Sequence, residues 1–564
     1  MSKMLTGGQL VARQLKKEGV KTVFALSGGH IMPIMYGLRE EGIEVISVRH
    51  ESAGGYAADA YARVSGKPGV VITTAGPGVL NCVTPMVEAF EAGTPLIHIG
   101  GGGFQNMYDS GVAQDSPTLD LMKTVCKDAK RCLVTERLPE YVRGAFRRAT
   151  SADSGPVYLE IPITTVMGKA DEDEVAFPEA DAVASAVFGD PDRMNAAAQM
   201  LAEAKKPVLV LGEQCRYSTL HGEYVEKLVN YLQIPVHSTF LPAVRGLFAD
   251  ETKNELFSLG EAAVAAADLI LELNVNNLQN LGRAKPPAFN KAAKVIQINE
   301  DKNKIGFNRD ADVGIVASPG AAAMQLYREA SALVPQVAAG AWVEEARQLT
   351  AKARKFFSDA KTSEAQPPVP GRLAAETVKF LAENAPDWHV ICDGGDAAQW
   401  ILYNSVARYP GQVVKFSNLG TIGTGAGFSL GAWAADRKPV LYYVGDGSFG
   451  FHAMEFETFV RNGVPVVCVI SNDSAWGMIK LAEGLSKPDF IKEHGHHSVN
   501  LLQDMFSYEK MTEMWGGVGI RIDRYEDVIP SLKKIMDSGK PGILNCEVDK
   551  EAYSPRTLGF ASVM

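Results

Sequence analysis

Two acidic residues follow two long apolar runs in the last third of the chain. The run Val440–Val444 leads into Asp446, and the run Val464–Ile470 leads into Asp473. Apolar residues recur with helical spacing between the two runs, so the stretch predicts a strand–helix–strand unit with an acidic residue after each strand. Parallel strands end at the same edge of a sheet, and ligands of open α/β sheets bind at that edge.

This predicted edge has the chemistry of a site for a cation that carries a diphosphate. The two carboxylates supply oxygen ligands, which hard cations such as Mg²⁺ prefer. The backbone amides of Gly447 and Ser448 would lie at a helix N-terminus, where phosphate groups bind. The alternative is that the acidic residues cap two unrelated strands, because a short Gly-Asp-Gly sequence is common.

The whole segment resembles the metal–diphosphate motif of thiamine diphosphate enzymes. In that family an Asp, the second residue of a following Asn pair and a backbone carbonyl two residues later hold Mg²⁺. The resemblance assigns these roles to Asp446, Asp473 and the carbonyl of Ala475. Asp473 departs from the commoner Asn, but a carboxylate is also a good Mg²⁺ ligand, and some acetolactate-synthase-like relatives carry Asp there. We interpret it as a variant of the motif.

Length and composition indicate a multidomain globular protein. The chain has 564 residues, too many for one core, with 46% hydrophobic and 22% charged residues. A net charge of −10 and the lack of a long basic run argue against a nucleic-acid surface. No apolar stretch predicts a membrane span or a signal peptide. The seven scattered cysteines suit reduced core thiols, so we expect a cytoplasmic protein.

Apolar strands alternate with helical patterns in three successive blocks, which predicts three doubly wound parallel-sheet α/β domains. We expect these domains at residues 1–180, 190–345 and 365–564. The acidic, strand-free Gly168–Asp181 and the proline-rich Ser363–Gly371 are predicted as linkers. The predicted strands are Val23–Gly29, Val45–Glu51, Gly69–Gly78, Pro95–Gly101 and Gly155–Pro162; Pro207–Gly212, Ile234–Phe240, Asp268–Asn274, Lys294–Glu300 and Val313–Ser318; and His389–Asp396, Val413–Asn418, Val440–Val444, Val464–Ile470 and Gly542–Val548.

In the first block, Glu51 ends the second predicted strand. An acidic residue at a strand end is usually a solvated cap. However, Arg-His-Glu followed by an alanine-rich helix and a strand into TTAGPG resembles the pyrimidine-binding domain of thiamine diphosphate enzymes. The family glutamate contacts the aminopyrimidine N1′ and drives it to the imino tautomer. The resemblance gives this catalytic role to Glu51, which needs a dry surrounding to share its proton.

Other residues of this block are candidates for the same site. Thr74, Gly76 and Asn81 lie in a tight strand-to-helix turn that suits close cofactor approach or, alternatively, simple fold geometry. The segment from Gly28 to His30 resembles benzaldehyde lyase and 2-hydroxyacyl-CoA lyases, in which a histidine faces the reacting carbonyl. His30 could therefore move a proton at the substrate oxygen. A loop glutamine that matches a family glutamine is the third candidate catalytic residue, Gln114.

In the third block, small residues surround the predicted cofactor. The resemblance makes the Gly420 carbonyl an acceptor for the 4′-amino group and Ile422 the wedge that bends the cofactor, although Ile422 could also be a core residue. Residues expected to contact the diphosphate or border the substrate are Gly395, Asp396, Trp476, Gly477 and Met478.

Two further sequence features bear on the reaction. Acetolactate synthases commonly carry a Gln-Trp pair after the metal loop, where this chain has Leu481-Ala482, which weakens a synthase interpretation without excluding it. The cluster His494, His496 and His497 fits no tetrahedral zinc spacing, so we expect a mobile, solvated lid segment there.

The chain is thus identified as similar to the acetohydroxyacid synthase, benzaldehyde lyase and 2-hydroxyacyl-CoA lyase branch of thiamine diphosphate enzymes. The resemblance implies thiamine diphosphate and Mg²⁺ as cofactors and a homodimer or homotetramer with the cofactor between subunits. It favours C–C cleavage or ligation of 2-hydroxyacyl-CoA or 2-hydroxyketone substrates, with decarboxylation and carboligation of 2-oxo acids as the alternative. The middle-block sequence LELNVNNLQN gives no support for FAD, which some relatives bind, and intact Glu51, Asp446 and Asp473 argue against an inactive scaffold.

Overall fold

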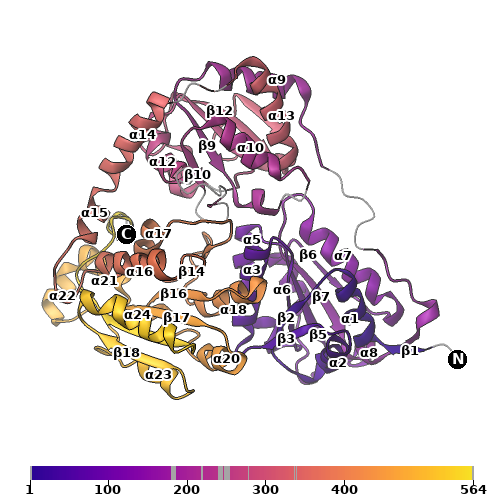
Figure 1. Cartoon of the computed structure of the whole chain (residues 1–564). Helices are drawn as coiled ribbons and strands as arrows, with labels where there is room; N and C mark the ends of the chain where they lie inside the picture. The colour runs from indigo at the N-terminus through magenta and orange to yellow at the C-terminus, as the bar shows by residue number, and fades with distance from the viewer. Residues whose placement is uncertain are drawn as a thin grey trace.

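The chain folds into three α/β domains that follow one another in sequence (Figure 1). The computed structural model describes residues 3–179, 186–217, 220–238, 245–246, 255–276, 278–335, 337 and 340–561. The first and third domains lie side by side at the bottom of Figure 1, and the middle domain lies above them. Helix α14 (Gly340–Ala353) and helix α15 (Lys355–Lys361) run from the middle domain back to the third.

The first domain is a six-stranded parallel sheet in the order β3-β2-β4-β5-β7-β6. Its central strands are buried along their length, as expected for strands covered by helices on both faces. The strands are β2 (Thr22–Ala25), β3 (Glu44–Ser47), β4 (Gly69–Thr73), β5 (Leu96–Gly102), β6 (Asp128–Arg131) and β7 (Val157–Pro162). The helices are α1 (Gly7–Lys17), α2 (Met32–Glu40), α3 (Glu51–Ser65), α4 (Pro77–Leu80), α5 (Val83–Ala92), α6 (Thr118–Val125), α7 (Leu138–Thr150) and α8 (Ile163–Met167).

The middle domain is a five-stranded parallel sheet in the order β10-β9-β11-β12-β13. Its core is separate from those of the other domains. The strands are β9 (Pro207–Leu211), β10 (Val236–Ser238), β11 (Leu269–Leu273), β12 (Lys294–Asn299) and β13 (Val313–Val316). The helices are α9 (Pro191–Glu203), α10 (Glu223–Leu232), α12 (Leu256–Ala263) and α13 (Pro319–Leu333).

The third domain is a six-stranded parallel sheet in the order β15-β14-β16-β17-β19-β18. The strands are β14 (His389–Cys392), β15 (Val413–Lys415), β16 (Val440–Gly445), β17 (Val466–Asn472), β18 (Val518–Ile522) and β19 (Gly542–Glu547). The helices are α16 (Pro370–Asn384), α17 (Asp396–Asn404), α18 (Gly425–Asp436), α19 (Asp446–Phe449), α20 (Glu455–Asn462), α21 (Gly477–Ser486), α22 (Pro488–His494), α23 (Glu509–Glu513), α24 (Val528–Asp537) and α25 (Pro555–Ala561).

The predicted parallel three-domain architecture is confirmed, and each of the fifteen predicted strands has a counterpart in a sheet. The last residues of the predicted strand Ile234–Phe240, as well as Asn277, lie outside the described residues. Two predictions are wrong. Glu51 does not end a strand but begins α3, because the His50 side chain accepts the Ser52 amide as a helix cap.

The second wrong prediction is that Gly168–Asp181 is free of strands. It contains β8 (Lys169–Asp171), which pairs antiparallel with β1 (Met4–Thr6) at the start of the chain. A three-residue strand with a distant partner leaves no local pattern, which is why the sequence did not reveal it. The short edge strands β6, which is mostly charged, and β18, which carries a glycine and an arginine, were also missed, because neither has a clear strand pattern in the sequence.

The first and third domains are joined by close packing of α3 against α18. Residues 427 and 431 are glycines because a Cβ there would lie 2.6 Å and 2.0 Å from the carbonyl oxygens of Ala53 and Ala57. The seven cysteines are all buried and free, as predicted. Among the described residues, no helix is long and apolar enough to cross a membrane.

Candidate active site

A cavity of about 430 Å³ opens at the carboxyl edge of the third domain's sheet. All twelve third-domain residues predicted to contact cofactor or metal line it. They come from the ends of β14, β16 and β17 and from the loop after β15, as a parallel sheet requires. The structure thus brings this group together in one place, and their individual roles remain predictions.

Asp446 and Asp473 face each other in this cavity. Asp446 is only 2% exposed, and its Oδ2 is buried without a hydrogen-bond partner among the described atoms. Burial, and then the neighbouring Asp473 charge, raise the pKa of Asp446 well above its ordinary value. A buried and a partly buried carboxylate with an unsatisfied oxygen between them fit a divalent cation, which would neutralise them both. No cluster of three or more metal-ligating side chains occurs in the described ranges, so the remaining ligands would come from backbone and diphosphate oxygens.

Asn472, the first residue of the Asn-Asp pair, stabilises the turn that follows β17. Asn472 is fully buried, and its Oδ1 accepts the Ser474 amide at 3.1 Å. This bond holds the turn in which Ser474 adopts a φ of +57°. The turn directs the next residues into the cavity. Position 477 is a glycine because a Cβ there would lie only 2.2 Å from the Asp473 Oδ2.

The loop that carries Gly420 and Ile422 is held by a buried carboxylate that sequence analysis did not single out. Asp393, at the end of β14, is 0% exposed. Its Oδ1 accepts the Gly423 amide at 3.0 Å, and its Oδ2 accepts the Gly425 amide at 2.8 Å. Gly423 has a φ of +80°, so the loop turns in a way that a side chain would oppose. Its place at a buried strand end, three residues before Asp396, was the available signal.

Asp396 lines the cavity, but its carboxylate is engaged with the protein. Its Oδ1 accepts the Ser554 amide at 2.8 Å and the Thr557 hydroxyl at 2.6 Å, while its Oδ2 accepts the Trp400 indole N–H at 2.6 Å. These bonds anchor the start of α25, whose Arg556 and Phe560 also line the cavity. The geometry therefore favours a role for Asp396 in fixing the C-terminal wall.

The candidate residues of the first domain gather at the carboxyl edge of their own sheet. Glu51 is 8% exposed, and its Oε2 accepts the Asn81 amide at 2.9 Å. His30 Nδ1 lies 3.2 Å from the Thr74 hydroxyl. The first contact connects α3 with the residue after α4, and the second connects the turn before α2 with the β4–α4 turn. Both contacts thus involve the segment from Thr74 to Asn81.

Two glycines fit closely within this group. Gly76 has a φ of +60°, and a Cβ there would lie 3.0 Å from the Gln114 Cα. A Cβ at Gly28 would lie 2.4 Å from the Thr74 Cβ. The lack of a side chain at Gly76 and Gly28 thus lets the backbone lie close to Gln114 and Thr74. His30 is partly exposed, and burial lowers the pKa of its imidazole, so the ring is neutral at pH 7.

The two groups do not share a cavity within one chain. The described lining of the third-domain cavity extends from Pro370 to Phe560 and includes no residue of the first domain. Glu51 therefore does not face the Asp446–Asp473 pair of its own chain across this space. Each chain carries two half-sites.

The histidine segment after α21 does not form a metal cluster. His494 stacks on Phe490 with ring centroids 4.2 Å apart, and His497 Nδ1 lies 3.0 Å from the Glu483 Oε2. His494 and His496 are exposed. The segment is solvated, as expected, and lies beside the helix that follows the metal loop.

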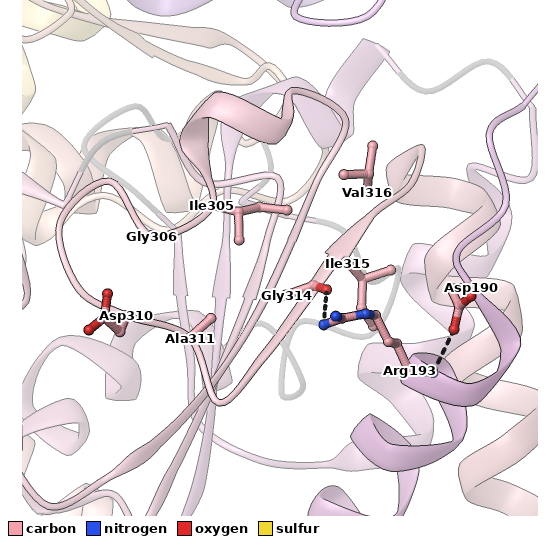
Figure 2. A pocket seen from close by; sticks show the side chains of 9 residues that line it. All are labelled: Asp190, Arg193, Ile305, Gly306, Asp310, Ala311, Gly314, Ile315 and Val316. Carbon is pink, nitrogen blue, oxygen red and sulfur yellow. Dashed lines mark hydrogen bonds between the residues drawn. The ribbon is translucent and has the colours of Figure 1, made fainter.

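A second hollow, of about 650 Å³, lies at the edge of the middle domain beside β13 (Figure 2). Its one basic side chain, Arg193, already donates to the Gly314 carbonyl at 3.2 Å, and the Arg193 amide donates to Asp190. None of the predicted site residues lines this hollow. It offers no reactive group beyond two carboxylates.

Three family models match successive parts of the chain. They are the thiamine pyrophosphate enzyme N-terminal TPP binding domain at residues 5–123, the central domain at 194–326 and the C-terminal TPP binding domain at 378–546. Each match falls within one of the three structural domains.

The chain also resembles curated proteins along nearly its whole length. It is 29% identical to "2-hydroxyacyl-CoA lyase 2" of Danio rerio, over 97% of this chain and 92% of that protein. It is 27% identical to "Acetolactate synthase large subunit IlvG" of Mycobacterium tuberculosis, over 98% of each chain. It is 26% identical to "2-hydroxyacyl-CoA lyase 1" of Mus musculus, over 97% and 95%. These relatives carry both of the activities that the sequence left open.

Proposed function

The chain belongs to the thiamine pyrophosphate enzyme family, and from this premise we propose that it is a Mg²⁺-dependent C–C lyase and carboligase. Its substrates would be 2-hydroxyacyl-CoA esters or 2-hydroxyketones. Bound thiamine diphosphate supplies the carbanion chemistry of such reactions. The residues of this chain bind and orient the cofactor and move protons.

The binding roles follow from the cavity. Asp446, Asp473 and the Ala475 carbonyl would hold Mg²⁺, and the backbone around Gly447 and Ser448, at the start of α19, would receive the diphosphate. The orphaned buried oxygen of Asp446 supports this assignment. Gly420 and Ile422 would contact the pyrimidine side of the cofactor.

The two half-sites support an assembly in which a second copy completes each cavity. Glu51 would then reach the cofactor held by the partner's third domain. Side chains near both half-sites are exposed in the single chain, including Leu80, Leu419 and Phe451 at 42%, 41% and 55%. Burial of such apolar side chains favours association. We propose at least a homodimer.

The observation that carries the lyase assignment is the neutral, partly exposed His30 beside Thr74. Cleavage of a C–C bond next to a hydroxyl requires a base that takes the hydroxyl proton as the aldehyde leaves. A neutral imidazole can accept that proton and return it in the ligation direction. Decarboxylation of a 2-oxo acid releases CO₂ and needs no such base.

The alternative is decarboxylation of a 2-oxo acid followed by carboligation, which the synthase relative favours. The apolar Ala482, which is 4% exposed on α21, provides no polar group for a second oxo acid. The absence of the Gln-Trp pair at this point supports the lyase proposal.

The test supplies thiamine diphosphate and Mg²⁺ and measures two products in parallel. One assay follows aldehyde release from a 2-hydroxyacyl-CoA ester and from a benzoin-type hydroxyketone. The other follows CO₂ release from pyruvate. We expect aldehyde release that exceeds CO₂ release and that falls in His30→Gln. Rapid CO₂ release without aldehyde would replace the lyase assignment by the synthase one.

A further inference from the structure

The loop at residues 417–424, which carries Gly420 and Ile422, is held at its start by a first-domain carboxylate and at its end by a third-domain histidine that itself contacts the first domain. At its start, the Ser417 hydroxyl donates to the Glu88 Oε2 at 2.9 Å, and the Ser417 amide donates to the Glu88 Oε1. At its end, the Gly423 carbonyl lies 2.6 Å from the His452 Nδ1. Both connections lead to one helix, α3.

The connection at Gly423 has a defined direction. A carbonyl only accepts hydrogen bonds, so the His452 Nδ1 must carry the proton. Burial lowers the pKa of His452 to about 4, so the ring is neutral and its Nε2 is an acceptor. The Ser52 hydroxyl lies 2.7 Å from that Nε2 and 2.6 Å from the His50 Nδ1, so its single proton is shared between two acceptor nitrogens. Ser52 is the residue after Glu51.

The connection at Ser417 is built from buried charges. Glu88 is 0% exposed, and Arg63 donates to its Oε1 at 3.2 Å. Arg63 is 3% exposed, binds Asp59 through two further bonds and donates to the Lys415 carbonyl at 2.6 Å. Breaking a buried network of this kind leaves charges uncompensated. Arg63 lies on the last turn of α3.

We propose that α3 positions the 417–424 loop for cofactor activation, through Ser52 and His452 at one end and through Arg63 and Glu88 at the other. The proposal rests on the function proposed above. It makes Ser52, His452 and Glu88 positioning residues, since none of them lines the cavity. The helix that begins with Glu51 thereby also fixes the loop that carries the Gly420 carbonyl.

A second feature ties the same segments together. The Glu455 Oε1 accepts the Arg49 and His50 amides at 2.8 Å and 3.1 Å, and its Oε2 accepts the Thr458 hydroxyl at 2.6 Å. The segment from His452 to Glu455 thus contacts the start of α3 through hydrogen bonds that both of these side chains make. A shift of α3 would be transmitted to Gly423 by two routes.

The test uses two substitutions that separate the two bonds of His452. In His452→Asn the side-chain amide N–H can replace Nδ1 and donate to Gly423, but it is too short to reach Ser52. In His452→Gln the amide reaches the position of Nε2 and loses the bond to Gly423. The two variants remove the same ring, so each is the matched control of the other.

Two measurements are made on each variant. In cofactor-free protein, hydrogen–deuterium exchange of the peptide spanning residues 417–424 reports how firmly the loop is held. In protein loaded with thiamine diphosphate and Mg²⁺, exchange of the cofactor C2 proton reports activation. We expect His452→Gln to accelerate loop exchange and slow C2 exchange by at least tenfold each. We expect His452→Asn, which keeps the bond to Gly423 and loses only the link to Ser52, to change both rates in the same direction by a smaller factor.

The proposal is overturned if His452→Asn leaves both rates at the wild-type values, because the link from Ser52 would then contribute nothing, or if loop exchange changes while C2 exchange does not. Ser52→Ala is a further arm, and it should move both rates in the direction of His452→Gln. A wild-type protein that binds thiamine diphosphate and exchanges C2 but cleaves no hydroxy substrate would refute the proposed function alone. A wild type that binds no thiamine diphosphate would refute both.

Discussion

Replacement of Asp473 by Asn is expected to stabilise the metal-free protein and weaken its Mg²⁺ site. Asp473 is partly buried beside Asp446, and burial raises the pKa of Asp473 to about 6 from its ordinary 3.8. An acid whose pKa is raised by folding destabilises the fold once the unfolded chain ionises. The penalty is absent below pH 3.8, grows as the pH rises towards 6 and is complete above it.

The size of this penalty follows from the same values. A difference of about two pKa units corresponds to about 3 kcal/mol, at about 1.4 kcal/mol for each unit. Because the Asp473 side chain is not fully buried, solvent screening reduces this to about 1–3 kcal/mol at pH 8. Removing the Asp473 charge also removes its repulsion of the Asp446 carboxylate, which further stabilises the metal-free fold. The neutral Asn oxygen remains a Mg²⁺ ligand, but a weaker one.

The assay is urea unfolding with EDTA at pH 8 and pH 5, followed by titration with Mg²⁺ and thiamine diphosphate. We expect Asp473→Asn to raise the unfolding free energy at pH 8 by about 1–3 kcal/mol, to gain less at pH 5 and to need more Mg²⁺. Asp109→Asn, at an exposed carboxylate of the first domain whose backbone φ of +63° an Asn also tolerates, is the matched control. A loss of stability at pH 8, or an unchanged Mg²⁺ requirement, would refute the paired-carboxylate reasoning.

Three further predictions concern the half-sites and the middle domain. Glu51→Gln should lower turnover and cofactor C2 exchange by about 10²–10⁴-fold, with unfolding by urea unchanged because the amide can still bond Asn81; wild-type turnover would contradict its role. Mixed and refolded Glu51→Gln and Asp446→Ala chains should regain up to about a quarter of the activity, because half of the dimers then contain one intact site; no recovery would place the site within one chain. Burial raises the pKa of Glu272 to about 7, so this residue destabilises the fold increasingly as the pH rises from 4.5 to 7. Glu272→Gln should therefore raise the unfolding free energy by up to about 3 kcal/mol at pH 8 and by less at pH 5. An equal gain at both pH values in urea unfolding would contradict this.

The sequence predicted most of the fold because the decisive signals are local. A run such as Val464–Ile470 is apolar throughout, as a strand covered on both faces must be, and the polar Ser471-Asn472-Asp473 that follows marks its end at the sheet edge. Elements held by distant partners were not predictable in this way. The strand at Lys169–Asp171 exists only because Met4–Thr6 pairs with it, and neither stretch has a period that a window can detect.

The same distinction divides the site. Residues that would touch the cofactor, such as Asp446 and Ile422, lie in short motifs whose chemistry can be identified from residue type and spacing. Asp393 and Glu88 are as closely involved with the loop, yet they appear in the sequence as isolated acidic residues. Their importance lies in buried hydrogen bonds to backbone amides that are 30 and 329 residues away. A motif therefore identifies what a site binds, while the residues that set its geometry become visible only in the folded chain.

This division also bears on the choice between lyase and synthase. The cofactor-binding residues are common to both activities, so the cavity at Asp446 cannot separate them. What differs is the handling of the substrate hydroxyl, which in the proposed assembly falls to first-domain residues of a second copy of the chain. His30 is neutral because burial lowers its pKa, and it remains partly exposed at the edge where that second cofactor would lie. In the proposed assembly the first-domain half-site would decide the reaction without holding the diphosphate or the metal, so substitution of His30 should affect aldehyde release more than cofactor binding.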